Sequence, residues 1–218
     1  NIAFDQVEIF QRKKRQTEAS KFCSIKEVKH LDKEILPTVK NDLKNISLKR
    51  KSILGLKFHK PIIIGALNIT PDSFSDGGLF FENSKAYEQA KLMINSGATI
   101  VDIGGESTRP GSITVDEKDE WKRVENTITN VKKNFPKTLL SLDTRKSYVM
   151  SKGIESGVDI INDVSGLKFD KKSFDLINLK KKPFILHHMQ GTPETMQNNP
   201  TYEDVLLDIF DFFEAKIN

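Results

Sequence analysis

The stretch PIIIGALNIT at residues 61–70 opens the part of the sequence that decides the fold. It is one of five short runs that are almost continuously apolar and rich in Ile, Val and Leu, and each run ends in a polar residue or a glycine. Runs of this kind are typical of strands in a parallel sheet that is covered on both faces. The other four are TIVDIGG at 99–105, LLSLDT at 139–144, DIINDVSG at 159–166 and PFILHHM at 183–189.

Longer amphipathic stretches separate these runs, and we expect them to be helices. Strands that alternate with helices, without antiparallel hairpins between them, indicate an α/β fold with a parallel sheet. The turn after the first strand lacks a glycine-rich phosphate loop, which argues against a Rossmann or P-loop fold and favours a barrel. The expected helices lie at approximately 84–96, 115–134, 146–156, 170–181 and 202–217.

A polar side chain stands near the end of each expected strand. Because the carboxyl ends of parallel strands meet at the same edge of the sheet, these side chains are expected to converge on one mouth. One such residue is commonplace and usually structural, whereas five in succession indicate the rim of an active site. They are Asn68, Asp102, Asp143, Asn162 and His187 or His188.

The first 58 residues differ in charge from the rest. Residues 1–60 carry 15 Lys and Arg against 7 Asp and Glu, and residues 61–218 carry 19 against 23. Such a basic segment could contact nucleic acid, but acidic residues interrupt it and aromatic residues are sparse, so we favour a solvated surface. Ser24 and Glu27 match a capping box, and apolar residues recur at helical spacing as far as Ile46. Pro37 is expected to give a kink or two short helices. These features predict a basic helical extension or linker over 1–58 and a second domain over 59–218.

Composition also restricts the compartment and the partners. No apolar run approaches the roughly 20 residues of a membrane span. The single cysteine, Cys23, cannot form an internal disulfide, which suits a reducing compartment. We therefore expect a cytoplasmic protein with neither nucleic acid nor a membrane as its partner.

Five motifs then carry a specific resemblance. In order, they are NITPDSFSDGG at 68–78, GGESTRPGS at 104–112, LSLDTRKS at 140–147, IINDVSG at 160–166 and HMQGTPETMQ at 188–197. The region from about 52 to 218 resembles the dihydropteroate synthase family. The resemblance implies a TIM (β/α)8 barrel and a transferase of folate biosynthesis. Such an enzyme joins p-aminobenzoate to 6-hydroxymethyl-7,8-dihydropterin pyrophosphate, works with Mg²⁺ and is a target of sulfonamides.

The resemblance also implies roles for residues at the strand ends. Asp143 matches the family's carboxylate for the N–H edge of the pterin, and Asn162 matches its amide for the same ring. A plainer interpretation of Asp143 is a cap on the helix that follows. Asn68 matches a ligand of Mg²⁺, a hard cation that prefers oxygen and keeps most of its waters.

Two loops complete the implied site. In the first, Asp72, Ser73, Phe74 and Asp76 are expected to bind substrate, with Phe74 covering p-aminobenzoate and excluding water. In the second, Ser107 and Pro110 bind substrate, Thr108 contacts the leaving phosphate and Arg109 serves the p-aminobenzoate side. The implied catalytic residues are thus Asp143, Asn162, Thr108 and Arg109. Asp102 and Glu106 are expected to orient these loops.

His187 departs from the family pattern. The resemblance implies methionine at this position, in the wall of the pterin pocket, and a titratable ring there could stack on the pterin or add a hydrogen bond. We therefore expect His187 to contact the pterin and to alter its affinity.

The number of visible units is another departure, because five strand–helix units are present where a barrel has eight. The sequence thus predicts a barrel incomplete at its C-terminus, inactive and poorly soluble alone, and a homodimer when the barrel is complete. The extension is where a fused hydroxymethylpterin pyrophosphokinase would be joined. A non-catalytic pterin-binding homologue and a pterin-dependent methyltransferase domain are the alternatives.

Overall fold

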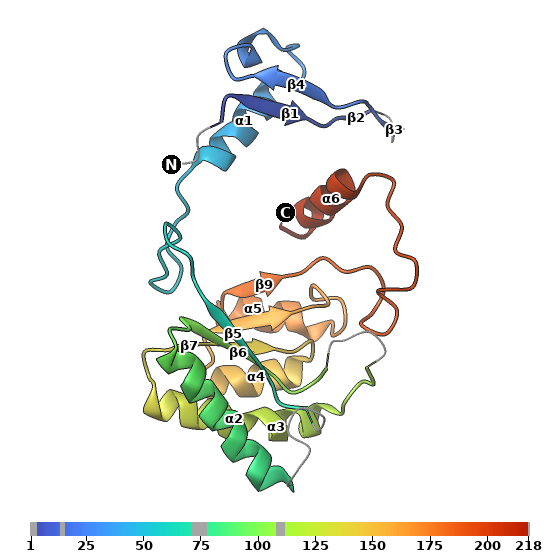
Figure 1. Cartoon of the computed structure of the whole chain (residues 1–218). Coiled ribbons are helices and arrows are strands. Elements are labelled where there is room, and N and C mark those ends of the chain that lie inside the picture. The colour runs from blue at the N-terminus through green and yellow to red at the C-terminus, as the bar shows by residue number, and fades with distance from the viewer. Residues whose placement is uncertain (1–3, 14–15, 71–77, 108–111, 218) are drawn as a thin grey trace. The chain divides into compact units, whose positions relative to one another are not determined.

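The computed structural model describes residues 4–13, 16–70, 78–107 and 112–217 (Figure 1). The chain divides into two compact units. One is Asn1–Ser52 together with Thr201–Asn218, and the other is Ile53–Pro200. No helix among the described residues is long and apolar enough to cross a membrane.

The first unit begins with antiparallel strands. β1 (Gln6–Ile9) pairs with β4 (Lys21–Ser24), and β2 (Arg12–Lys13) pairs with β3 (Gln16–Thr17). A 3-10 turn, η1 (Val28–His30), and helix α1 (Leu36–Ser47) follow. Helix α6 (Val205–Ile217) is grouped with this unit and buries none of its residues. The small core consists of Ile9, Cys23, Val28, Leu31 and Val39.

The prediction of a helical segment is therefore wrong for residues 6–24. QVEI alternates polar and apolar residues, and in KFCS the adjacent Phe22 and Cys23 point to opposite faces, so each strand turns one side chain, Ile9 or Cys23, into the core. The Ser24 N–H does donate to Glu27 Oε2 at 3.2 Å, but the turn that follows ends at His30. A helix restarts at Leu36 with Pro37 in its first turn, where the missing N–H has no partner to lose.

The second unit contains a five-stranded parallel sheet in the order β5-β6-β7-β8-β9 (Figure 1). Each strand pairs with the next in sequence, as successive units of a barrel wall do. The strands are β5 (Ile64–Asn68), β6 (Ile100–Gly104), β7 (Leu139–Asp143), β8 (Ile160–Asp163) and β9 (Phe184–Leu186).

Helices connect the strands and pack on one face of the sheet. They are α2 (Gly78–Asn95), α3 (Glu117–Asn134), α4 (Ser147–Glu155) and α5 (Lys172–Lys180), and consecutive helices contact each other. Leu67, Ile103, Leu142 and Ile161 point to this face and join the helices in the main core. Helix α4 approaches closely because Gly153 has no side chain: a Cβ there would lie 2.3 Å from Leu142 Cδ2.

The opposite face differs from the prediction of a sheet covered on both sides. On β5 its side chains, including Ile64 and Asn68, are exposed, and Asp102, Asp143 and Asn162 on the next strands are half-buried. This face also carries apolar side chains, of which Ile100 and Ile160 are buried, while the polar residues lie towards the carboxyl ends of the strands. In a barrel this second face is the interior.

All five predicted helices after residue 61 are present, with shifted ends. Helix α2 begins at Gly78, several residues before the predicted start. Helix α3 starts behind Asp116, whose carboxylate accepts the Lys118 N–H at 2.9 Å. Helix α6 starts behind Asp204, which accepts the N–H groups of Leu206 and Leu207. Side-chain caps thus set two of these boundaries, as expected for Asp at an N-cap.

Candidate active site

Three of the five predicted strand-end residues form one lateral row. Asn68 on β5 is paired in register with Gly104 on β6, Gly104 with Asp143 on β7, and Asp143 with Asn162 on β8. Residues paired in this way point to the same face of a sheet. The row therefore places two amides and a carboxylate side by side at the carboxyl edge.

Gly104 keeps the middle of this row open. A Cβ at this position would lie 3.5 Å from Asn68 Oδ1 and 3.6 Å from Asp143 Oδ2. The oxygens of Asn68 and Asp143 therefore border a space that any side chain at 104 would enter. This space is where two oxygen donors from β5 and β7 can face a common ligand.

Asn162 is held by a chain of hydrogen bonds. Its Nδ2 donates to Asp102 Oδ2 at 2.9 Å, and its Oδ1 lies 2.6 Å from Nε2 of His187. Because the Asn162 Oδ1 can only accept, the His187 Nε2 must carry the proton of this bond. The other oxygen of Asp102, Oδ1, is buried without a hydrogen-bond partner among the described residues. Asp102 was predicted to orient the loops, but in the structure it orients Asn162.

Asp143 has an unusual protonation equilibrium. Burial, followed by the negative charges of Asp102, Glu120, Asp163 and Glu106, raises its pKa to about 7. A carboxyl group with such a pKa exchanges its proton near neutral pH and can act as an acceptor or a donor. Strongly shifted carboxyl groups of this kind cluster at functional sites.

Asp143 does not cap the helix that follows it. Helix α4 has Lys146 at its N-cap without a side-chain cap bond, and the Ser147 N–H donates to Asp170 Oδ2 at 2.9 Å. The plainer interpretation of Asp143 as a helix cap is therefore wrong. Its carboxylate is left to the row at the sheet edge.

A buried cluster of four charged side chains lies behind the row. Glu106 follows β6, Glu120 lies in α3, and Arg145 and Lys146 follow β7, all at least nine-tenths buried. Glu106 Oε2 accepts Arg145 Nε at 2.9 Å, Glu106 Oε1 accepts Lys146 Nζ at 2.9 Å, and Lys146 also pairs with Glu120. Two acids and two bases balance formally, which is how buried charges become tolerable.

The two acids of this cluster are perturbed in opposite directions. Burial favours a raised pKa for Glu106, but hydrogen bonds from Arg145, Lys146 and the Val115 N–H outweigh it and hold that pKa below its ordinary value. Burial raises the pKa of Glu120, and its contact with Lys146 offsets only part of this effect. Sequence reasoning missed Arg145, Lys146 and Glu120, because adjacent basic residues usually indicate a solvated turn.

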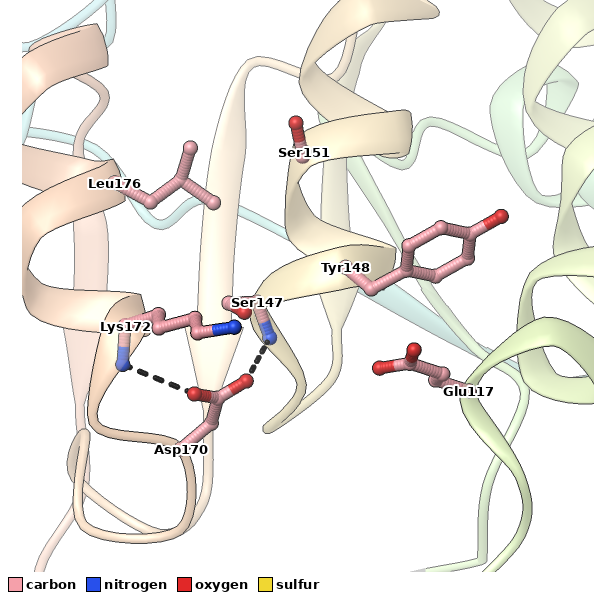
Figure 2. A pocket seen from close by; sticks show the side chains of 7 residues that line it. All are labelled: Glu117, Ser147, Tyr148, Ser151, Asp170, Lys172 and Leu176. Atoms are coloured by element: carbon pink, nitrogen blue, oxygen red, sulfur yellow. Dashed lines mark hydrogen bonds between the residues drawn. The ribbon is translucent and has the colours of Figure 1, made fainter.

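A cavity of about 410 Å³ lies elsewhere, among the N-terminal ends of three helices (Figure 2). Asp170 accepts the N–H groups of Ser147 and Lys172 there, both at 2.9 Å. None of the predicted site residues that the structure describes borders it. Its lining consists of Glu117, Ser147, Tyr148, Ser151, Asp170, Lys172 and Leu176.

The comparisons agree with this arrangement of strands and polar ends. A family model described as pterin binding enzyme matches residues 64–218. The chain belongs to the pterin-binding enzyme family. The match includes the five strands of the sheet and every described residue of the row.

The individual relatives of this chain that follow are all dihydropteroate synthases. Dihydropteroate synthase of Haemophilus influenzae is 43% identical over 158 residues, which are 72% of this chain and 57% of that protein. The crystal structure of Yersinia pestis dihydropteroate synthase with a sulfonamide drug complex has a TM-score of 0.68 at 40% identity, covering 74% of this chain and 58% of that one. For the enzyme from Clostridium difficile in the presence of pteroic acid the TM-score is 0.65 at 39% identity, covering 72% and 57%.

These likenesses confirm the predicted TIM-barrel fold, of which the described residues form five β/α units. The chain spans somewhat more than half the length of the relatives that it matches. Several predicted site residues of the family lie outside the described residues: Asp72, Ser73, Phe74 and Asp76 in the first loop and Thr108, Arg109 and Pro110 in the second.

Residues on both sides of the second loop are described, and Glu106 holds one of them; that Glu106 orients the loop itself stays a prediction. Glu106 Oε1 accepts the Val115 N–H at 2.8 Å, which ties together residues nine positions apart. The carbonyl of Ser107 accepts from the Ser112 hydroxyl at 2.6 Å. Hydrogen bonds therefore fix the described residues on both sides of residues 108–111.

Proposed function

We propose that the protein containing this chain is a dihydropteroate synthase. It would condense 6-hydroxymethyl-7,8-dihydropterin pyrophosphate with p-aminobenzoate to give 7,8-dihydropteroate and pyrophosphate. The observation that carries the proposal is the row of Asn68, Asp143 and Asn162 around the open position at Gly104. The identities of 39–43% with dihydropteroate synthases support the choice of reaction.

Asp143 and Asn162 would bind the pterin ring. An ionised Asp143 can accept two N–H groups of the ring, a charge-assisted contact that also stabilises positive charge developing on the pterin. Asn162 offers both a donor and an acceptor, and its bonds to Asp102 and His187 fix which is which. The two side chains are lateral neighbours, as recognition of one planar edge requires.

Asn68 would hold the Mg²⁺ that accompanies pyrophosphate. Its Oδ1 borders the open space at Gly104, and a hard cation prefers such an oxygen. Mg²⁺ usually keeps several waters and takes few protein ligands, so one amide oxygen beside phosphate oxygens is a suitable donor set. No group of three or more His, Cys, Asp or Glu that could hold a metal occurs among the described residues. When bound, the ion would neutralise charge on the departing pyrophosphate.

The bond changes then follow. The bond between the pterin methylene carbon and the ester oxygen breaks, and pyrophosphate leaves with the electron pair. The amine nitrogen of p-aminobenzoate supplies its lone pair to that carbon and releases a proton. Thr108 would contact the leaving phosphate, and Ser107 would bind substrate. Arg109 and Pro110 would lie on the p-aminobenzoate side. Asp72, Ser73 and Asp76 would bind substrate. Phe74 would cover p-aminobenzoate and exclude water, which would otherwise capture the electron-poor methylene carbon of the pterin.

The remaining features of the proposal concern partners and location. Sulfonamides would compete with p-aminobenzoate, as the drug complex of the Yersinia pestis relative suggests. A homodimer, a fused pyrophosphokinase and a cytoplasmic location stay predictions.

Turnover by the protein that contains this chain tests the proposal. Purified enzyme with both substrates and Mg²⁺ should release pyrophosphate and form dihydropteroate, and Asp143→Asn should lower the rate at least about 100-fold, since it removes the charge that stabilises the transition state. The exposed Asp119→Asn on α3 is a matched control and should leave the rate unchanged. Pterin binding without turnover would instead favour the non-catalytic homologue.

A further inference from the structure

Arg145 gathers segments that follow three different strands. Its Nε donates to Glu106, directly after β6, and its Nη2 donates to Thr114 Oγ1 at 2.9 Å, just before α3. Its guanidinium also lies over the ring of Phe169, after β8, with Cζ 4.1 Å from the ring centroid. Arg145 itself follows β7 and is buried. A planar guanidinium is suited to such a junction because its donors diverge in fixed directions.

The junction extends further through Thr114. Its hydroxyl, which accepts from Arg145, lies 3.4 Å from Glu194 Oε1 in the segment after β9. Lys146 strengthens the same point, since its Nζ shares Glu106 Oε1 with the Val115 N–H and also pairs with Glu120. The buried ionic cluster therefore joins residues that follow β6 and β7. Phe169 after β8 contacts it through Arg145, and the exposed Thr114 connects it to Glu194 after β9.

The two sides of the candidate site depend on this cluster to different degrees. The turn after Asp143 has supports that do not involve it: the Thr144 N–H donates to the Asn162 carbonyl at 3.0 Å, and the Ser147 N–H donates to Asp170. The segment 112–115 has fewer, because Val115 is anchored on Glu106 and Thr114 on Arg145 and Glu194. Loss of the cluster should therefore loosen this segment and Ser107, which is bonded to Ser112.

We propose that Arg145 and Lys146 are positioning residues, which fix Glu106, Ser107 and residues 112–115 against the turn that carries Asp143. The inference rests on the proposed function, because the effect that it predicts is weaker binding of p-aminobenzoate with unchanged affinity for the pterin. It goes beyond that function because neither residue belongs to the predicted substrate contacts.

Arg145→Lys is the sharpest variant, because it keeps the positive charge but not the fork that reaches Glu106 and Thr114 together. We expect hydrogen exchange of the Val115 amide to become at least about tenfold faster and KM for p-aminobenzoate to rise about tenfold, since small misplacements can cost up to roughly 100-fold. The dissociation constant for the pterin should stay within about twofold, because the turn that carries Asp143 keeps its hydrogen bonds at Thr144 and Ser147 and so its geometry. Thr114→Val, which removes only an exposed hydroxyl and alters no charge, should change the exchange rate and KM in the same direction by a smaller factor.

Lys132→Met is the matched control. Lys132 Nζ pairs with Asp159 Oδ2 at 2.5 Å, and the two side chains are 19% and 22% exposed. The pair lies at the C-terminal end of α3 and at the edge of the sheet opposite to Asp143. It should lower the melting temperature without altering Val115 exchange or either substrate constant.

Three results would overturn the inference. The first is Val115 exchange in Arg145→Lys within twofold of wild type, and the second is faster exchange without a rise in KM. The third is an equal rise in KM in Lys132→Met. A wild-type protein that forms no dihydropteroate would reject the proposed function instead. In that case the exchange rates of the three variants, which need no substrate, would still decide whether the cluster fixes the segment.

Discussion

His187 Nε2 lies 2.6 Å from Oδ1 of Asn162, so a ring nitrogen occupies one acceptor site of the amide that is proposed to read the pterin. Because Asn162 Nδ2 is already committed to Asp102, the amide cannot turn over without losing both bonds. His187 therefore fixes the direction in which Asn162 presents its remaining donor and acceptor.

Replacing His187 by methionine should weaken pterin binding about fivefold, because one neutral hydrogen bond contributes about 1 kcal/mol. Isothermal titration with a dihydropterin analogue measures this effect. In an Asn162→Ala background the same replacement should have no further effect, since the bond has already lost its acceptor. Equal effects in both backgrounds would show that His187 acts on the ligand without Asn162.

The raised pKa of Asp143 predicts a specific pH dependence of stability. The folded value of about 7 exceeds the ordinary value, so the folded state keeps a proton that the unfolded state releases. The stabilising contribution is complete below about pH 4 and is lost as the pH rises towards 7. Urea unfolding, followed through Trp121, should show a decline of about 1–3 kcal/mol from this group between pH 5 and pH 8. Asp143→Asn should remove that part of the decline, and Asp119→Asn should not; identical curves for all three proteins would contradict the prediction.

Asp170 should contribute more stability than an ordinary cap, because it accepts N–H groups at the starts of both α4 and α5 (Figure 2). Burial favours a raised pKa for Asp170, but the bonds from Ser147 and Lys172 lower it, so this contribution is present at neutral pH and lost on acidification. Asp170→Ala should cost about 2 kcal/mol in the free energy of unfolding, and Asp170→Asn less.

The control for Asp170 is Asp116→Ala, which removes a single cap bond to Lys118 and should cost about 1 kcal/mol. Thermal unfolding of the three variants at pH 7 gives the comparison. A smaller loss for Asp170→Ala than for Asp116→Ala would show that the double cap adds nothing.

Asn68→Ala should weaken pyrophosphate binding about tenfold when Mg²⁺ is present, since the ion loses its protein oxygen. With the metal removed by a chelator, wild type and variant should bind pyrophosphate equally. Asn130→Ala, on the surface of α3, serves as the control. A difference that persists without Mg²⁺ would mean that Asn68 contacts the phosphate directly.

Much of the second unit was predictable because its signals are local. The apolar runs marked the strands, and parallel pairing brings their ends together, so Asn68, Asp143 and Asn162 could be placed at one edge before any coordinates. The bond between Asp102 and Asn162 was not predictable, since it joins residues 60 positions apart whose relative register depends on two intervening pairings.

The buried ionic cluster could not be predicted from the sequence for another reason. Glu106, Arg145 and Lys146 have the composition of surface turns, and only burial by α3 and the following loops makes them structural. The N-terminal strands were missed because each is four residues or shorter and is surrounded by charged residues that suggest a solvated helix.

The formal neutrality of the cluster of Glu106, Glu120, Arg145 and Lys146 also limits how this part of the chain can evolve. Loss of one charge leaves an uncompensated ion in the interior, whereas loss of an acid and a base together is far better tolerated. Substitutions at these four positions should therefore occur in compensating pairs among related sequences. A library that removes one charge at a time would reject the substitutions at all four positions, and one that removes an acid and a base together would find the permitted combinations.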